Sequence, residues 1–585
     1  MKKENFLWTS SKTGLLGGAI AIFICLLGMV EIFNKRYVID ELLPLGIFLL
    51  LATAFATGFI ASRRAQEQFS ESQPVYNLIT GALGGAIVGI LLMVLIIATD
   101  QINLRNVFLN ASPTLVSILT FGRGLSGVWI MAVIGVAFGF FGGAFLIVPE
   151  KYRNPILRSL LWSFLLALFS GLFRVVLINQ GSVFEAIAKF LFGTTGLSLF
   201  GAILIFASIL FISMLSSRGG SSVRQRITQL PKRNQVILRV VVIALIVYIA
   251  IGLPQVSGPF IAQVIVILGL YTLMGLGLNI TLGFAGLLDL GFVAFYAIGA
   301  YTVGLLTSYG QFGLQHISFW LAAPIAVLVA MLFGAFLGLP VLGVRGDYLA
   351  IATLGFGEIV RLLAGSDFLS PYFGGPRGII GIQKPCLGFL ESFIKVDTPQ
   401  VCNGIEFGGP KEIYYIAVIS AILIAFIAWR LRESRLGRAW MAIREDEDVA
   451  EALGINLIQT KLLAYMLGAA FAGLGGAIFS TLVGSIFSSS MQLIVSINVV
   501  ALLVVGGMGS IPGVVVGTIA LIGLPELLRE VSEYRFLLYG IALIGMMLSK
   551  PEGLWPSQAV LRELHHEVPI PETGSSLAPE VATPE

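Results

Sequence analysis

Four polar side chains stand out because the sequence around each of them is apolar. They are Asn279, Asp289, Glu358 and Asn498. Polar and ionisable groups at membrane depth are costly and usually mark a solute or ion pathway, so these four are our candidate pathway residues. Structural alternatives stay open: Asp289 can end a helix at a wetted surface, Glu358 can pair with Arg361, and an Asn can bond a neighbouring helix.

The motifs of enzymes, metal sites and nucleotide sites are missing from the sequence. None of the patterns CxxC, HExxH or GxxxxGK[ST] occurs, and the three Cys and three His show no metal-ligand spacing. We therefore expect no catalytic residue, no metal and no cofactor in this chain. If ATP drives the protein, separate subunits must bind it with Mg²⁺. The net charge of +4 is too small and too scattered for a nucleic-acid-binding protein.

Residues 431–460 form the most charged stretch of the chain. Within it, 439–453 is rich in helix-forming residues, and Gly454 and Asn456 follow as stop signals. One side of the predicted helix is partly apolar, with Trp440, Met441, Ile443, Val449, Ala450 and Leu453. Because water does not stabilise that side, we expect it to dock on this chain's own cytoplasmic face or on a separate partner.

Several sequence blocks resemble a known family. Asp448-Val449-Ala450, followed by Gly454, is similar to the E-A-A-x-x-x-G signature of ABC-importer permeases, with Asp for Glu and Val for the first Ala. The wider sequence resembles the LivM-type branched-chain amino-acid permeases over about 236–557. The blocks, all in family order, are GLNITLGFAGLLDLGFVAFYAIGAY (277–301), AIATLGFGEIVRLL (350–363), GGPRGIIGI (374–382), GRAWMAIREDEDVAEALGIN (437–456), KLLAYMLGAAFAGLGGAIFS (461–480), GGMGSIPGVVVG (506–517) and PEGLWPS (551–557).

The resemblance implies the permease subunit of an ATP-driven ABC importer for branched-chain or other neutral amino acids. It implies a second homologous permease subunit, two ABC ATPase subunits and an extracytoplasmic solute-binding protein as partners, in a lipid membrane. It also implies that the helix within 439–454 couples to an ATPase. The candidate coupling residues are Arg444, Glu445, Asp448, Val449, Ala450, Glu451 and Gly454.

Two alternative functions remain compatible with these residues. Related permeases carry urea and short amides, and no residue decides between those solutes and amino acids. An ion-coupled secondary transporter would need polar ion sites in broken helices, for which Asp289 and Glu358 are candidates. Such a transporter would not need an amphipathic helix at 439–454, and that feature therefore favours the ABC permease.

The composition indicates that a membrane surrounds these residues. Hydrophobic residues make up 57% of the 585 residues and charged residues 12%, against about 25% charged in a soluble protein. We therefore predict an all-α, polytopic integral membrane protein with about sixteen membrane segments. Six are predicted in the first part, at 13–33, 41–61, 77–98, 126–148, 156–178 and 193–215. Ten follow, at 236–253, 260–282, 286–307, 318–339, 347–364, 412–430, 461–484, 489–506, 511–528 and 534–549.

The predicted segments fall into two blocks joined by a basic linker at 216–235. Residues 1–215 form an N-terminal membrane block of about six spans, whose role is unknown and for which a structural or regulatory module is one reading. Residues 236–557 form the LivM-like core. The polar tail at 558–585 is expected to be disordered.

Lys and Arg cluster in alternate loops, which predicts the orientation of the chain. Both termini are expected in the cytoplasm, with the protein in the cytoplasmic (inner) membrane of a bacterium. The long loop at 365–411 then lies outside, where disulfides persist. It contains Cys386 and Cys402, although the cysteine count alone does not establish that they pair.

Overall fold

The computed structural model describes residues 6–68, 74–102, 104–178, 182–218, 232–313, 317–341, 347–388, 404–527, 540, 544–545 and 552–556. The chain divides into two compact units, residues 1–252 and 253–585. The division falls inside α12 (Lys232–Leu278). The domain bounds expected around the linker at 216–235 stay a prediction, since most of that linker lies outside the described residues.

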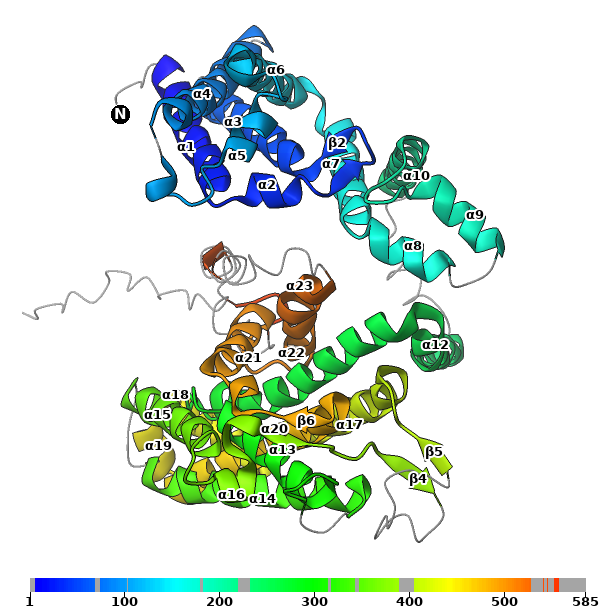
Figure 1. The fold of residues 1–585 in the computed structure, drawn as a ribbon, viewed down its shortest axis with the longest axis vertical. Coiled ribbons are helices and arrows are strands. Elements are labelled where there is room, and N and C mark those ends of the chain that lie inside the picture. The colour runs from blue at the N-terminus through cyan, green and yellow to red at the C-terminus, as the bar shows by residue number, and fades with distance from the viewer. Residues whose placement is uncertain are drawn as a thin grey trace, which may run out of the picture. The chain divides into compact units, whose positions relative to one another are not determined.

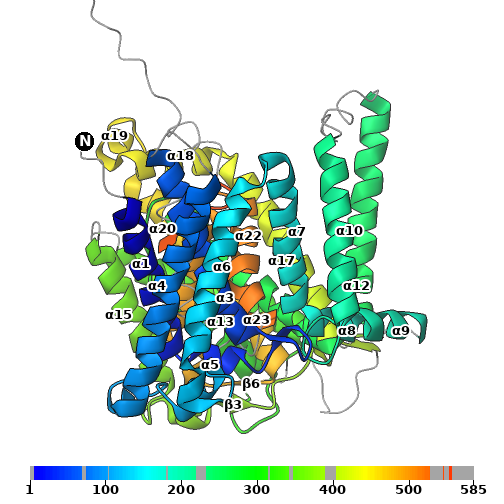
Figure 2. The same cartoon turned by 90° about the horizontal axis from the view of Figure 1, so that it is seen from above.

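The N-terminal unit is a bundle of helices with one small sheet (Figure 1). Four of its helices, α1, α3, α4 and α6, pack side by side along a common direction (Figure 2). Strands β1 (Tyr37–Ile39) and β2 (Leu43–Pro44) pair antiparallel. The helices are α1 (Phe6–Leu26), α2 (Met29–Phe33), α3 (Leu45–Gln68), α4 (Pro74–Gln101), α5 (Pro113–Leu119), α6 (Val128–Ile147), α7 (Glu150–Leu168), α8 (Ser170–Ile178), α9 (Ser182–Leu191) and α10 (Leu199–Arg218), with short 3₁₀ turns η1 (Leu104–Asn106) and η2 (Gly124–Gly127).

Glycines bring α4 and α6 into close backbone contact. A Cβ atom at Gly139 of α6 would lie 2.7 Å from the Cα atom of Gly85 in α4, nearer than any real side chain approaches. Gly81 and Gly135 extend the same row of contacts. Small residues at such spacing allow apolar helices to associate in lipid, where no hydrophobic force draws them together.

The second unit contains the remaining elements, which pack around α20 (Leu457–Val483) and its neighbours α13 (Val293–Thr307) and α14 (Phe319–Val341). The other helices are α15 (Asp347–Ala364), α16 (Ser370–Phe373), α17 (Pro410–Arg432), α18 (Arg435–Glu445), α19 (Glu447–Ala452), α21 (Leu493–Gly506), α22 (Ile511–Thr518) and α23 (Leu524–Leu527). Short turns are η3 (Asn279–Phe284), η4 (Gly375–Arg377), η6 (Ser488–Ser490) and η7 (Ile519–Gly523).

Helix breaks in the second unit fall at Gly and Pro, as the sequence predicted in general terms. Gly258 interrupts α12 with φ +83°, a conformation that residues with a Cβ rarely adopt, and it separates the expected segments 236–253 and 260–282. At its other end α12 runs into η3, a π-helical turn that extends to Phe284. Single π-turns of this kind often occur at functional sites.

One end of α20 is held by the loop that follows α15. Strand β3 (Ile379–Ile380) of that loop pairs antiparallel with β6 (Ser485–Ile486), which follows α20 directly. The ammonium of Lys384 donates hydrogen bonds to the carbonyl oxygens of Thr481 and Leu482, at 2.6 and 3.1 Å. These carbonyls end the helix and have no partner within it, so a cation is favoured there.

The loop also contains a second sheet and a disulfide-bonded cysteine. Strands β4 (Cys386–Gly388) and β5 (Gly404–Glu406) pair antiparallel. Cys386 is disulfide-bonded. Cys402 lies outside the described residues. Cys25 of α1 is a free, buried cysteine.

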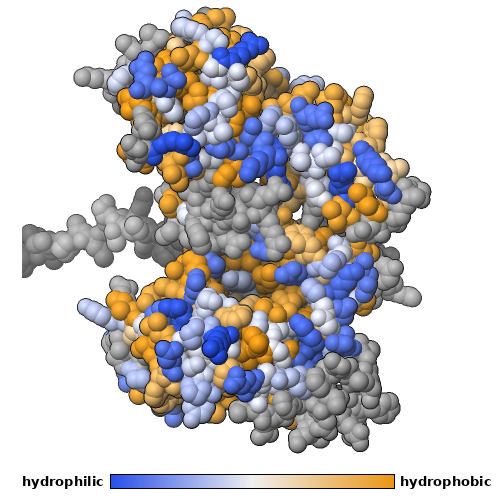
Figure 3. Space-filling view, viewed as in Figure 1, coloured by the Kyte–Doolittle hydropathy of each residue, from blue (hydrophilic) through white to orange (hydrophobic). Residues whose placement is uncertain are grey.

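The prediction of an all-α, polytopic membrane protein is confirmed. The described residues contain eight helices that are long and apolar enough to cross a membrane, and four shorter apolar helices. Figure 3 shows apolar side chains over much of the face that it presents, as expected of helices in lipid. The predicted segment 156–178 is broken at Phe169, and most of 534–549 lies outside the described residues, so the count of sixteen stays a prediction.

Candidate functional site

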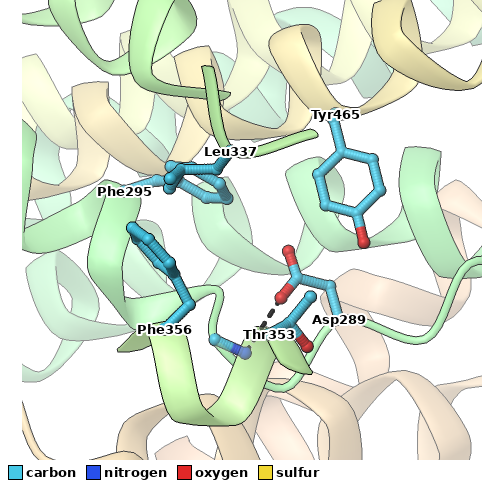
Figure 4. A pocket seen from close by; sticks show the side chains of 7 residues that line it. Asp289, Phe295, Leu337, Thr353, Phe356 and Tyr465 are labelled. Atoms are coloured by element: carbon cyan, nitrogen blue, oxygen red, sulfur yellow. Dashed lines mark hydrogen bonds between the residues drawn. The ribbon is translucent and has the colours of Figure 1, made fainter. Parts of the chain in front are cut away.

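A small cavity lies between the start of α13 and the first third of α20. Its wall includes Asp289, in the loop between η3 and α13, and Tyr465, on α20 (Figure 4). The remaining lining residues are Gly291, Phe295, Leu337, Thr353 and Phe356. The cavity measures about 10 Å³, which is the space for a single water molecule and not for an amino acid.

The polar atoms around this cavity are only partly satisfied. One carboxylate oxygen of Asp289 accepts a hydrogen bond from the backbone N–H of Gly291 at 2.9 Å, while the other has no partner. The hydroxyl of Tyr465 also has no partner. The exposed fractions of the two residues are 1% and 2%. The hydroxyl of Thr353 accepts from the N–H of Leu290 at 3.0 Å and so fixes the loop against α15.

The charged stretch predicted as one helix over 439–453 is two helices. The helix α18 ends at Glu445, and Asp446 turns the chain before α19 begins at Glu447. The reason is local: a carboxylate oxygen of Asp446 accepts hydrogen bonds from the N–H groups of Asp448 and Val449, at 2.9 and 3.0 Å, and so starts a new helix. The prediction of a single continuous helix was therefore wrong.

Helix α18 docks on its own chain, one of the two possibilities that the sequence left open. Trp440 is fully buried, and its indole N–H donates to the carbonyl oxygen of Thr460 at the start of α20, at 2.8 Å. Ile443 is buried beside it. The guanidinium of Arg444 donates to the carbonyl oxygen of Gly283 in η3, at 2.9 Å. Helix α18 thus contacts α20, which carries Tyr465, and η3, which precedes the loop of Asp289.

Helix α19 has a different surface. Val449 of α19 and Leu453, which directly follows it, are one turn apart and are 54% and 76% exposed, whereas Ala450 is buried. Glu447 anchors the helix through an ion pair with the buried Lys461 of α20, at 2.6 Å. At Gly454 the chain has φ +86° and the helix ends. An apolar pair is therefore presented on a helix that is fixed from behind.

The comparisons with known proteins concern the second unit. Residues 260–548 match the family model described as "Branched-chain amino acid transport system / permease component". The high-affinity branched-chain amino acid transport system permease protein LivM of Escherichia coli K12 is 41% identical over 296 residues, which are 49% of this chain and 68% of that protein. This chain belongs to the LivM-type branched-chain amino-acid permeases.

More distant relatives share the same part of this LivM-type permease. A probable LivM permease of Methanocaldococcus jannaschii is 22% identical over 360 residues, covering 52% of this chain and 94% of that protein. The LivH permease of Escherichia coli K12 is 25% identical over 300 residues, covering 48% and 90%. No solved structure matches the chain. The family match begins at residue 260, so the N-terminal unit lies outside it.

The structure of this LivM-type permease separates the four candidate pathway residues. Among them, only Asp289 lines the cavity. The side-chain oxygen of Asn279 accepts from the N–H of Gly509, in the turn between α21 and α22, at 2.9 Å, and its amide nitrogen is buried without a partner. Asn498 is buried in α21 with its side-chain oxygen unpartnered. Glu358 is paired with Arg361, and both are partly exposed on α15.

Three residues of this site were missed by sequence reasoning. Tyr465 and Thr353 line the cavity, and Lys461 anchors α19. Lys461 could have been found from the sequence, because a lysine near the start of an apolar helix is expected to pair with an acidic side chain. Thr353 and Tyr465 gave none, since each finds its neighbours only through packing of segments far apart in the sequence.

Proposed function

We propose that this chain is the permease subunit of an ATP-driven ABC importer that moves branched-chain amino acids across the cytoplasmic membrane of a bacterium. Membership of the LivM-type family supports the transport class. The single observation that carries the ATP-driven mechanism is the exposed pair Val449 and Leu453 on α19, beside a helix, α18, whose own apolar residues are buried. Such a surface favours a protein partner in the cytoplasm.

The partner that fits α19 is an ABC ATPase subunit. Burying Val449 and Leu453 in a groove would contribute about 1.5–3 kcal/mol each. The acidic side chains of Asp448 and Glu451 lie beside them and would meet a basic rim. Arg444 and Glu445, at the end of α18, flank the same surface. These residues, with Ala450 and Gly454, are the proposed coupling residues.

The contacts of α18 suggest how a movement of the ATPases would reach the membrane part. A displacement of α19 is passed to α18 through the short turn at Asp446. Helix α18 is bonded to η3 by Arg444 and to α20 by Trp440. Shifting α18 therefore acts on both elements, which is what a switch between inward-open and outward-open states requires.

The remaining parts of the machine belong to other chains. Two ATPase subunits would bind ATP with Mg²⁺, a second homologous permease would complete the membrane pathway, and an extracytoplasmic solute-binding protein would deliver the amino acid. In this arrangement α19 and both termini lie in the cytoplasm. The chain makes and breaks no covalent bond, so its residues act by binding and positioning.

The proposal is tested by reconstituting the full-length chain with its second permease, ATPases and binding protein in lipid vesicles. We expect leucine, isoleucine or valine to stimulate both ATP hydrolysis and uptake. Stimulation by urea but not by amino acids would identify a urea permease instead. Uptake driven by an ion gradient in the absence of the ATPases would overturn the ABC mechanism in favour of secondary transport.

The role of α19 is tested by reversing one charge. Asp448→Lys is expected to weaken ATPase binding by about tenfold or more, equivalent to about 1.4 kcal/mol, measured by pull-down and by coupled uptake. Glu433→Lys is the matched control, because Glu433 is an exposed acid in the same cytoplasmic stretch but precedes α18. Equal binding by both variants would show that α19 is only a solvated connector.

A further inference from the structure

The cavity between Asp289 and Tyr465 has the features of a site for one bound water molecule. Both side chains are almost completely buried, and each turns a polar atom without a partner toward the cavity (Figure 4). Buried polar atoms in proteins almost always have a hydrogen-bond partner, supplied by the protein or by an ordered water. Two such atoms at one cavity therefore indicate a shared ligand.

The size and lining of the cavity select water among small ligands. Its volume of about 10 Å³ corresponds to one water molecule, which needs two to four polar partners. The free carboxylate oxygen of Asp289 and the hydroxyl of Tyr465 supply two, whereas the hydroxyl of Thr353 already donates to the carbonyl oxygen of Ala350 and accepts from the N–H of Leu290. Phe295, Leu337 and Phe356 close the remaining walls.

A metal cation fits this lining poorly. Calcium and magnesium take six or more oxygen ligands, and the two unpartnered side-chain oxygens of this lining do not provide them. Among the described residues, no group of three or more His, Cys, Asp or Glu side chains could hold a metal ion. Water satisfies both unpartnered atoms without such a set.

We propose that Asp289 and Tyr465 hold one water molecule as a latch between the η3–α13 loop and α20, and that a shift of α18 opens it. Asp289 follows η3, which Arg444 of α18 contacts, and Tyr465 lies on α20 just after Thr460, whose carbonyl oxygen accepts from Trp440 of α18. Helix α18 therefore holds both sides of the latch. The opening step rests on the proposed importer function, whereas the water site does not.

The site is tested by a double-mutant cycle on the assembled permease complex. Asp289→Asn, Tyr465→Phe and the double variant are compared with the unaltered chain by thermal unfolding in lipid nanodiscs. Each single change is expected to lower the melting temperature, and the double change to lower it no further than the larger single one, because either removes the same bridge. Additive shifts would overturn the site.

Tyr301→Phe is the matched control for the loss of a hydroxyl. Tyr301 is also buried with an unpartnered hydroxyl, but it lies on α13 and does not line the cavity. Tyr465→Phe is expected to raise ATP hydrolysis in the absence of solute several-fold, while Tyr301→Phe leaves it unchanged. Because Tyr465→Phe preserves the ring, this comparison stands even if Asp289→Asn fails to fold. Equal hydrolysis by the two variants would overturn the latch.

Two further measurements separate the possible explanations. Replacing Na⁺ and K⁺ by choline is expected to leave the melting temperature unchanged, and a decrease would overturn the water site in favour of a cation. A non-additive cycle without solute-stimulated transport would keep the site and reject the importer function. Coupled transport with an additive cycle would keep the importer function and reject the site.

Discussion

The N-terminal unit and the LivM-type core are both built from apolar helices, but they bury different polar side chains. Among the described residues, the buried polar side chains of the N-terminal unit are all Ser, Thr or Asn. The core also buries Asp289 and Lys461. Burying an ionisable group costs far more than burying a hydroxyl, so such groups persist where they have a function.

The cavities of the two units also differ in the polarity of their linings. A cavity of about 630 Å³ in the N-terminal unit is lined by apolar side chains of α3, α6, α7 and α10, with Ser163 as its one polar lining residue. The cavity at Asp289 has only about 10 Å³ but faces two unpartnered polar atoms. Cavity volume alone therefore does not identify the functional site of this protein. The described residues that are buried and carry an acidic or basic side chain, Asp289 and Lys461, lie in the core, which favours a structural or regulatory role for the N-terminal unit.

The largest effect is expected from the contact of α18 with the core. Trp440→Ala removes a fully buried indole and its hydrogen bond, at a cost of about 3–5 kcal/mol in the free energy of unfolding. Uptake should be lost, because α18 would separate from α20. Trp129→Ala in α6 is the control, since Trp129 is exposed, and is expected to change stability by less than about 0.5 kcal/mol. Unaltered uptake by the Trp440 variant would contradict the role of α18.

A smaller effect is expected in the N-terminal unit. Gly139→Ala forces α4 and α6 apart and is expected to cost about 1–3 kcal/mol. Gly171→Ala in α8 is the control, because a Cβ atom there meets nothing within 4 Å. Thermal unfolding measures both. If the N-terminal unit is only structural, the Gly139 variant should keep its ATP-coupled uptake per assembled complex. Loss of coupling in this variant would show that the N-terminal unit takes part in transport.

A third effect is expected at Gly454, which follows α19. Gly454→Val places a β-branched residue at φ +86°, which costs on the order of 1–2 kcal/mol, with nothing within 4 Å for the side chain to strike. We expect weaker ATPase binding with unchanged membrane insertion. ATPase binding by the Gly454→Asn variant should lie between that of the unaltered chain and that of the Gly454→Val variant, because Asn tolerates left-handed dihedrals. If the amount of ATPase pulled down does not decrease from Gly454 to Asn to Val, ATPase binding does not require glycine at this position.

The smallest effect is expected at the ion pair on α15. Glu358 and Arg361 are 39% and 28% exposed, so solvent screens their pairing and it contributes little to stability. Glu358→Gln and Arg361→Gln should therefore change the KM for uptake equally and little. A large KM increase confined to the Glu358 variant would restore Glu358 as a solute contact.

Sequence reasoning reached the class of the protein and most helices, because long apolar runs and charged loops are local signals. It did not reach the break at Asp446. The residues around it favour helix, and only the capping bonds made by the Asp446 side chain reveal two helices. Similarly, the sequence singled out Asp289 but not Tyr465, since a tyrosine within apolar helix α20 looks like ordinary core.

The fixation of one end of α20 has a mechanical consequence. At that end Lys384 binds the last carbonyls and β6 pairs with β3, whereas the opposite end contacts α18 through Thr460. Burial lowers the pKa of the Lys384 ammonium, whereas the negative charge of the Glu406 carboxylate nearby raises it. A rod pinned at one end and pushed at the other turns about the pin. In the proposed switch, α20 would therefore turn about its end beside Thr481, with the greatest displacement at Thr460 and less at Tyr465.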